Sequence, residues 1–189
     1  MVNKYLGELF EYQNERSCFD SVAWHGNYYP YKYNLDDYSV INTVSFDHPD
    51  PSIFTVLTCP TTETGVAACD LAIFPPRWMV AEHTFRPPYY HRNIMNEFMG
   101  NICGVYDAKT QGFIPGSASL HSCMAGHGPA ADVFEKASTG DLEPVRYPDS
   151  NLAFMFETTY IMKIAPWALD NTDSTYLDCW KEMPKNFTI

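Results

Sequence analysis

Residues 52–74 read SIFTVLTCPTTETGVAACDLAIF and contain the clearest strand signals of the chain. The runs 52–59 and 66–74 are rich in β-branched and apolar residues, and a polar segment, TTETG at 61–65, separates them. Two such runs on either side of a glycine-containing turn are typical of a hairpin. A turn segment, DHPDP at 47–51, precedes the first run. The stretch therefore predicts two neighbouring antiparallel strands.

Two more segments have strand character. They are 97–106, EFMGNICGVY, in which Gly100 and Gly104 predict bulges or close backbone approach, and 151–165, NLAFMFETTYIMKIA. Successive strand residues point to opposite sides, so the longer segment should present two different faces. One face carries Ala153, Met155 and Glu157, and the other carries Phe154, Phe156 and Thr158.

The only convincing helix signal is the short segment 130–138, AADVFEKAS, which Gly128 and Pro129 precede. Several short strands separated by turn signals favour an all-β fold, either a sandwich or a barrel. Residues 1–40 are polar and rich in tyrosine, which predicts an irregular arm that packs on the rest of the chain. Residues 41–189 then form the main domain.

Composition excludes several classes of protein. Of the 189 residues, 46% are hydrophobic and 19% are charged, which excludes wholesale disorder. The net charge of −11 disfavours binding to nucleic acid or to an anionic membrane, because both attract positive charge. The six cysteines form no CxxC pair, which disfavours zinc ribbons and thioredoxin-type sites. We interpret them as reduced cysteines of a cytoplasmic protein.

The histidines are the strongest candidates for chemistry, although a single histidine is more often structural. His91 lies in FRPPYYHRNIMNE at 85–97, and Glu97 follows it by six residues. On a straight strand these two residues would lie about 20 Å apart. On a helix they would point about 240° apart. They can share a metal ion only if residues 92–96 reverse the chain, because metal ligands must all lie about 2 Å from the ion.

A second histidine-bearing loop, GFIPGSASLHSCMAGHGP at 112–129, adds His121 and His127. Two histidines and one carboxylate with open coordination positions form the facial triad of non-haem Fe(II) oxygenases. The spacing does not choose between His121 and His127. Cys123 is disfavoured as a nucleophile, because its neighbours are apolar and no cationic partner is evident.

Seven sequence segments, spread over the chain, carry a resemblance to a known family. They are WHGNYYPYKYNL (24–35), DHPDPSIFTVLT (47–58), FPPRW (74–78), FRPPYYHRNIMNEFMG (85–100), SLHSCMAGHGPAAD (119–132), FEKA (134–137) and NLAFMFET (151–158). Together they resemble the carboxy-terminal part of the homogentisate 1,2-dioxygenase family. The one visible departure is Ser117-Ala118, where the family usually carries glycine after Pro-Gly. The larger amino-terminal region of the family has no counterpart, so Met1 is expected to open a truncated chain.

The resemblance implies a cupin-like β-sandwich or jelly roll with irregular loops and one or two short helices, with residues 41–189 as the iron-binding domain. It also implies an enzyme that uses Fe(II) and O₂ to open the aromatic ring of homogentisate. The product is maleylacetoacetate, in the breakdown of tyrosine and phenylalanine. Family members assemble as trimers paired into hexamers, so a homo-oligomer is expected.

Site residues follow from the same resemblance, residue by residue. The iron ligands are two histidines and a glutamate, namely His91, Glu97 and His127. His48 of the DHPDP word matches the catalytic base, and Tyr106 of GVYDAK matches a substrate-binding tyrosine. His127 is also expected to touch the substrate. His121 matches a neighbouring pocket histidine outside the coordination sphere of the metal.

Three interpretations of the sequence differ in activity. The first is an iron dioxygenase that is active at least as part of a complete chain. The second is a non-catalytic fragment that keeps the metal residues but lacks the amino-terminal sandwich. The third is another cupin-type ring-cleaving dioxygenase with a different substrate.

Overall fold

The computed structural model describes residues 1–24, 26, 32–38, 43–44, 51–81, 83–84 and 88–188. The chain divides into two compact units. The first combines Met1–Tyr38 with Met162–Thr172, and the second combines Ser39–Ile161 with Asp173–Ile189. No helix among the described residues is both long enough and apolar enough to cross a membrane.

The first unit begins with a β-hairpin. Strand β1 (Val2–Tyr5) pairs antiparallel with β2 (Glu8–Glu11), and Leu6 and Gly7 make the turn with positive φ angles. The other regular elements of this unit are the single turns η1 (Cys18–Asp20) and η2 (Leu35–Asp37) and the short helix α2 (Pro166–Asp170). The sequence predicts an irregular arm at 1–40 and does not predict the paired strands β1 and β2 within it.

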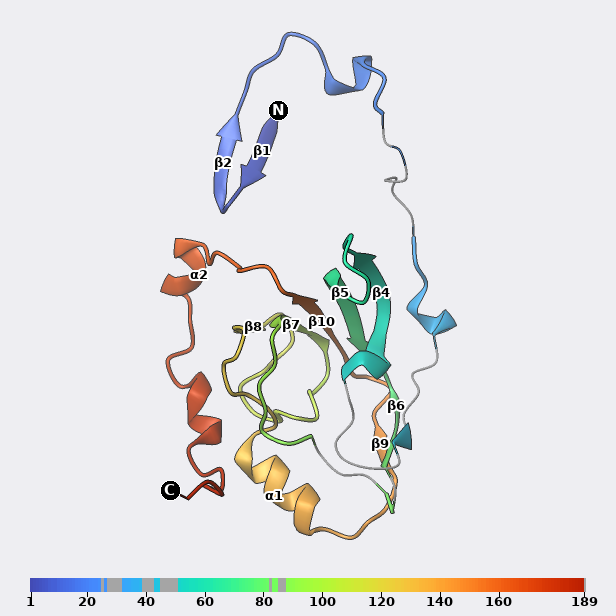
Figure 1. Cartoon of the computed structure of the whole chain (residues 1–189), viewed down its shortest axis with the longest axis vertical. Helices are drawn as coiled ribbons and strands as arrows, with labels where there is room; N and C mark the ends of the chain where they lie inside the picture. Colours follow the sequence, from blue (N-terminus) through green and yellow to red (C-terminus); the bar gives the residue numbers. More distant parts are fainter. Residues whose placement is uncertain are drawn as a thin grey trace. The chain divides into compact units, whose positions relative to one another are not determined.

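A five-stranded antiparallel sheet dominates the second unit (Figure 1). Its order is β4 (Thr55–Pro60), β5 (Ala67–Phe74), β10 (Leu152–Thr158), β7 (Asn96–Cys103) and β8 (Ala118–His121). A smaller sheet consists of β3 (Thr43–Val44), β6 (Arg77–Ala81) and β9 (Val145–Tyr147). Helix α1 (Ala131–Thr139) and the turns η3 (Pro51–Phe54) and η4 (Tyr176–Trp180) complete the unit.

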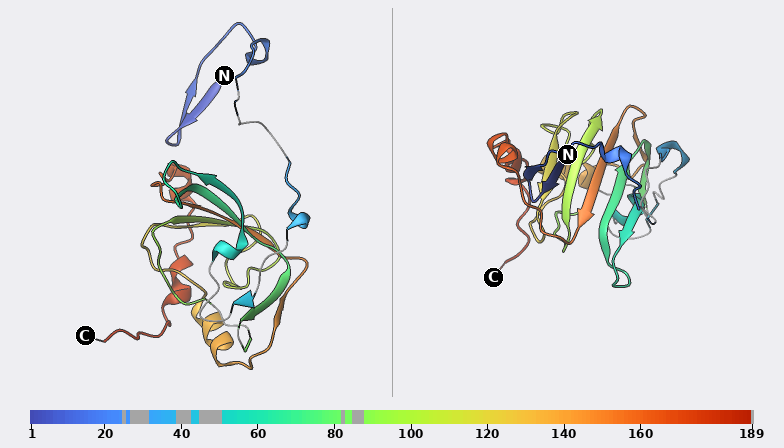
Figure 2. Two further views of the ribbon diagram at one scale, coloured as in Figure 1. Left: turned by 45° about the vertical axis from the view of Figure 1, so that its right-hand side comes forward. Right: turned by 90° about the horizontal axis from the view of Figure 1, so that it is seen from above.

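The smaller sheet and α1 lie on one side of the five-stranded sheet (Figure 2). The predicted fold class, an all-β, cupin-like sandwich with one or two short helices, is confirmed. The predicted hairpin is also confirmed as β4 and β5, although β4 begins only at Thr55 because Pro51–Phe54 form a 3₁₀ turn. The predicted helix at 130–138 appears as α1.

The longest predicted strand, 151–165, is wrong at its end. Strand β10 stops at Thr158, which pairs with Asn96, the first residue of β7. Beyond this pair β7 offers no neighbour, and Asn96 uses its side-chain amide to bind the carbonyls of Thr158 and Tyr160 (3.3 and 2.9 Å). Residues 159–165 keep a strand-like composition, but no strand that the structure describes pairs with them.

Close packing explains why glycine occupies position 100 within β7 and position 104 directly after it. A Cβ atom at Gly100 would overlap the ring of Phe154 on the neighbouring strand. At Gly104 a Cβ would overlap the side chain of Asn151, and the φ angle of +71° also favours glycine there. Both positions match the close backbone approach that the sequence predicts.

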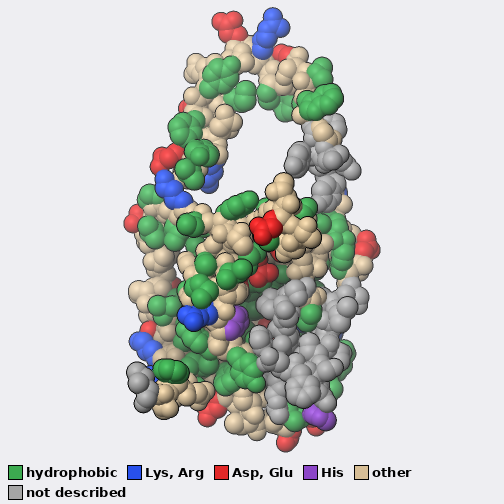
Figure 3. Space-filling model, viewed as in Figure 1, with side chains coloured by type: hydrophobic (Ala, Val, Ile, Leu, Met, Phe, Trp, Pro, Cys, Tyr) green, Lys and Arg blue, Asp and Glu red, His purple; other side chains and the backbone are tan. Residues whose placement is uncertain are grey.

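The core lies on the inner face of the five-stranded sheet. It contains Phe54, Ala72, Phe74, Met99, Phe113, Ala153 and Met155. The two faces of β10 differ as the alternation predicts, because Met155 is 2% exposed whereas Phe156 is 40% exposed. Large apolar side chains also remain exposed on the second unit, among them Trp78, Ile94 and Ile161. Hydrophobic side chains are accordingly spread over the face of the molecule in Figure 3.

Met155→Ala should lower the free energy of unfolding by about 2–5 kcal/mol, because it removes a buried side chain and leaves a cavity. Phe156→Ala, one residue along the same strand but on the exposed face, should cost clearly less. Urea denaturation of both variants measures the difference. Equal losses would contradict the assignment of Met155 to the core.

Candidate metal centre

Glu97 is a buried carboxylate on the inner face of the sheet. It is the second residue of β7, and the ladder to β8 pairs it directly with His121. Its exposed fraction is 3%. Side chains alternate along a strand, so Glu97 points to the same side as the core residue Met99. The sheet therefore holds a carboxylate inside the domain, where it needs polar partners.

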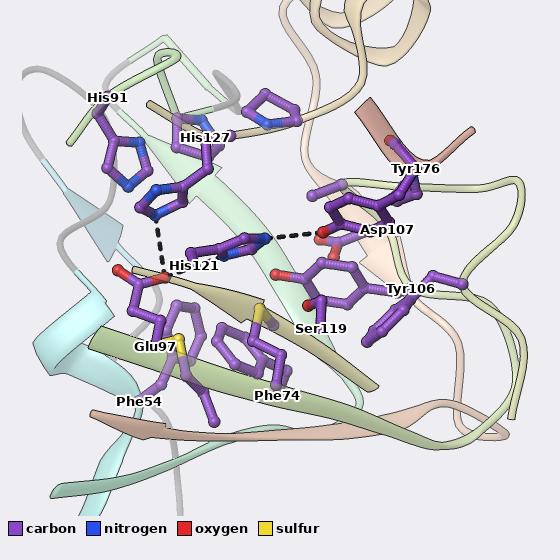
Figure 4. A pocket seen from close by; sticks show the side chains of 18 of the residues that line it. Phe54, Phe74, His91, Glu97, Tyr106, Asp107, Ser119, His121, His127 and Tyr176 are labelled. Carbon is purple, nitrogen blue, oxygen red and sulfur yellow. Dashed lines mark hydrogen bonds and ion pairs between the residues drawn. The ribbon is translucent and has the colours of Figure 1, made fainter. Parts of the chain in front are cut away.

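His91 and His127 face each other across a pair of backbone hydrogen bonds. The N–H of His91 donates to the carbonyl of His127 (2.7 Å), and the N–H of His127 donates to the carbonyl of His91 (2.8 Å). Their ring centroids lie 4.5 Å apart. Both rings lie beside Glu97 in Figure 4. Two distant loops are thus joined at the residues whose side chains enter the site.

The chain reverses between His91 and Glu97, as the sequence requires if both are to share an ion. Asn93 stabilises the reversal, because its Oδ1 accepts a hydrogen bond from the N–H of Met95 (2.8 Å). Its Nδ2 donates to Oε1 of Glu97. As a result, one possible ligand atom from each of His91, Glu97 and His127 lies within 4.8 Å of the other two.

Backbone carbonyls orient both imidazole rings. The Nδ1 of His91 lies 2.6 Å from the carbonyl oxygen of Tyr89, and the Nδ1 of His127 lies 2.9 Å from that of Ala125. A carbonyl oxygen can only accept, so Nδ1 carries the proton in each neutral ring and Nε2 keeps a lone pair. Metal-binding histidines are commonly held in this way.

Electrostatic interactions keep Glu97 ionised. Burial would raise its pKa, but the contacts with His121 and His127 and the amide of Asn93 outweigh burial and hold the pKa well below its usual range. Burial lowers the pKa of His127, and the neighbouring charge of Glu97 outweighs that effect and raises it. The site thus favours a positive charge beside Glu97, which either a proton or a metal ion can supply.

The donor set fits a metal ion. The Nε2 of His127 lies 3.0 Å from Oε2 of Glu97, but without the alignment of a hydrogen bond, so this buried nitrogen has no hydrogen-bond partner among the described residues. A cation between the two atoms would satisfy both. Two imidazole nitrogens and one carboxylate oxygen, with room for further ligands, are the donors found in mononuclear non-haem iron sites.

A cavity of about 120 Å³ adjoins these residues. Its apolar wall is continuous with the core and contains Phe54, Phe74, Met99, Phe113 and Met155. Tyr106 also lines the cavity, and its ring packs edge-on against Phe74 and Phe113, with centroids 5.7 Å away in each case. Burial raises the pKa of Tyr106, so its phenol stays neutral.

His121 differs from His127 in its partners. Its ring stacks on that of His127 with centroids 4.4 Å apart, and its Nδ1 lies 3.6 Å from Oε2 of Glu97. Its Nε2, however, lies 2.7 Å from the hydroxyl of Tyr176. Among the residues that the structure describes, the potential ligand group is His91, Glu97 and His127, so the geometry favours His127 where spacing alone left the choice open.

His48 lies outside the described residues, so its role stays a prediction. Sequence reasoning missed Asn93 and Tyr176. The position of Asn93 could have indicated its role, because it lies within the chain reversal that the His91–Glu97 spacing requires. Nothing in the sequence indicated a role for Tyr176, since it is 55 residues from His121.

The family model "Homogentisate 1,2-dioxygenase C-terminal" matches residues 36–187. The chain belongs to the homogentisate 1,2-dioxygenase family. The family's amino-terminal model matches residues 1–35.

Relatives named homogentisate 1,2-dioxygenase match the chain along its whole length. The protein from Dictyostelium discoideum is 57% identical and the human protein 55% identical, each over 100% of this chain. The protein from Pseudomonas fluorescens (strain Pf0-1) is 56% identical over 99% of it. These matches cover 44%, 43% and 44% of the respective relatives, so the chain spans less than half of their length.

Each of the variants His91→Ala, Glu97→Ala and His127→Ala should bind a divalent metal more weakly than the wild type. The loss should exceed ~10–100-fold, which is the typical loss when a residue that only holds a metal ligand in place is replaced. Each variant removes one of only three donor atoms. Metal titration followed by calorimetry measures the affinity. Cys123→Ala is the control, because Cys123 is exposed and its thiol lies outside the group. A Glu97→Ala variant with unchanged affinity would contradict the site.

Proposed function

We propose that this chain carries the Fe(II) centre of a homogentisate 1,2-dioxygenase. The reaction is the opening of the homogentisate ring with O₂ to maleylacetoacetate, a step in the breakdown of tyrosine and phenylalanine. The observation that carries the proposal is the convergence of His91, Glu97 and His127 within 4.8 Å, in a chain of this family. Relatives at about 55% identity carry that name.

The three ligands each have a defined part. His91 and His127 present neutral nitrogens because carbonyls hold their other ring nitrogens. Glu97 would supply one negative charge, which would offset part of the positive charge of a bound Fe(II) ion. When bound, Fe(II) supplies open coordination positions for substrate and O₂ and the capacity to exchange electrons with them.

Other residues of the chain bind the substrate and exclude water. The apolar wall of the cavity suits an aromatic ring. Tyr106 offers a neutral hydroxyl to a polar group of the substrate, and His127 borders the same space. His48 is proposed as the general base that takes a phenolic proton, because an imidazole titrates near neutral pH.

The proposal extends to assembly and location. We propose residues 41–189 as the iron-binding domain, with the first 40 residues as an arm. A homo-oligomer of trimers paired into hexamers would cover exposed apolar side chains such as Trp78 and Ile161. The six free cysteines suit the reducing conditions of the cytoplasm.

Iron analysis and an oxygen electrode test the function on the 189-residue chain. Bound iron with O₂ consumption on homogentisate, and much less on gentisate, is the expected result. Iron without turnover would favour the non-catalytic fragment. Faster O₂ consumption on gentisate would favour a different ring-cleaving enzyme, and absence of bound iron would refute the proposal.

His48→Ala should keep iron near its wild-type occupancy and lower turnover by roughly 10²–10⁴-fold, the usual contribution of general acid–base catalysis. The measurement needs a form of the protein that turns over homogentisate, and it pairs metal analysis with initial rates. His83→Ala is the matched control, because His83 is an exposed histidine. Iron loss in His48→Ala would make His48 a ligand, and unchanged turnover would make it structural.

A further inference from the structure

The turn η4 brings Tyr176 to the wall of the cavity, where its hydroxyl meets His121. The hydroxyl oxygen lies 2.7 Å from Nε2 of His121 (Figure 4). Tyr176 and His121 both line the cavity that adjoins the potential metal ligands. A contact thus connects the carboxy-terminal part of the chain to the histidine that stacks on His127.

Contacts that do not involve the hydroxyl hold Tyr176 in place. The Nζ of Lys109 donates to the backbone carbonyl of Tyr176 (3.2 Å) and lies 4.3 Å from the centre of its ring. The Nε1 of Trp180 donates to the carbonyls of Gly128 and Pro129 (3.0 and 3.2 Å), next to His127. Removing the hydroxyl alone should therefore leave the ring and the turn where they are.

The partners of His121 select one of its two neutral forms. Burial raises the pKa of Tyr176, and a hydrogen bond with the side chain of Ser119 lowers it by less, so the hydroxyl keeps its proton. The Tyr176 oxygen can accept a hydrogen bond from the Ser119 hydroxyl and donate its own proton to Nε2 of His121. The proton of the ring then sits on Nδ1, which faces the carboxylate oxygen Oε2 of Glu97 at 3.6 Å. In the other form a lone pair would face the negative charge, which is unfavourable.

We propose that Tyr176 is a positioning residue of the metal centre, which acts through His121 on the carboxylate of Glu97. The amide of Asn93 binds Oε1 of Glu97, and the N–H of His121 faces Oε2, so the two together set the plane of the carboxylate. This inference rests on the proposed metal centre and adds a residue that touches neither metal nor ligand. Loss of such partners typically lowers metal affinity by ~10–100-fold.

Calorimetric titration with Co(II) under anaerobic conditions measures the effect. Tyr176→Phe keeps the ring over Lys109 and should bind Co(II) roughly 10-fold more weakly than the wild type. Tyr147→Phe is the matched control, because the buried hydroxyl of Tyr147 has no hydrogen-bond partner in the described part of the chain, and the affinity of this variant should not change. Equal affinity of Tyr176→Phe and wild type would overturn the inference while leaving the metal centre intact. A wild-type chain that binds no Co(II) or Fe(II) would overturn both.

A double-mutant cycle separates positioning from a general structural effect. His121→Phe keeps a ring against His127 but has no nitrogen to receive the hydroxyl. In that background, Tyr176→Phe should cause no further loss of affinity. A loss as large as in the wild-type background would show that Tyr176 acts independently of His121 and would overturn the inference.

The tautomer of His121 can also be measured without any metal. In the ¹⁵N-labelled chain, the two-bond couplings of the imidazole nitrogens should indicate a proton on Nδ1 of His121. Tyr176→Phe should shift the ring towards the Nε2–H form, and Tyr147→Phe should not. A wild-type His121 with its proton on Nε2, or a signal that Tyr176→Phe leaves unchanged, would overturn the inference.

Discussion

A buried, ionised carboxylate is the constraint on which the site depends. Glu97 lies on β7, a strand with neighbours on both sides, beside the apolar core, and an unpaired charge in such surroundings is costly. Asn93, His121 and His127 surround it with donors and positive potential. The loops that carry Asn93 and His127 must therefore close over the inner face of the sheet whenever the domain folds.

Strands and loops position different residues of the site. The β7–β8 register sets Glu97 opposite His121, and this part is as rigid as the sheet. His91 and His127 come from loops, but their reciprocal backbone hydrogen bonds fix each loop against the other. Rigid strands thus position the charge, and the paired loops position the neutral nitrogens around it.

Family membership and geometry support different parts of the functional proposal. The similarity to proteins named homogentisate 1,2-dioxygenase points to the substrate and the reaction, but those relatives are more than twice as long as this chain. The geometry supports the metal centre alone. The residues of this centre, His91, Glu97 and His127, all lie in the second unit. The carboxy-terminal turn η4 belongs to the same unit, and through Tyr176 it contributes to the surroundings of the metal.

The sequence by itself determined the local features: the β4–β5 hairpin, helix α1, and the buried and exposed faces of β10. These follow from turn residues and side-chain alternation, which act between near neighbours in the chain. It also limited the ligand candidates and required a reversal before Glu97. Only the tertiary structure decided that β10 ends at Thr158, that His91, Glu97 and His127 lie close together, and that Tyr176 reaches the site. These depend on which distant segments form hydrogen bonds with one another, and no local pattern of residues records that choice.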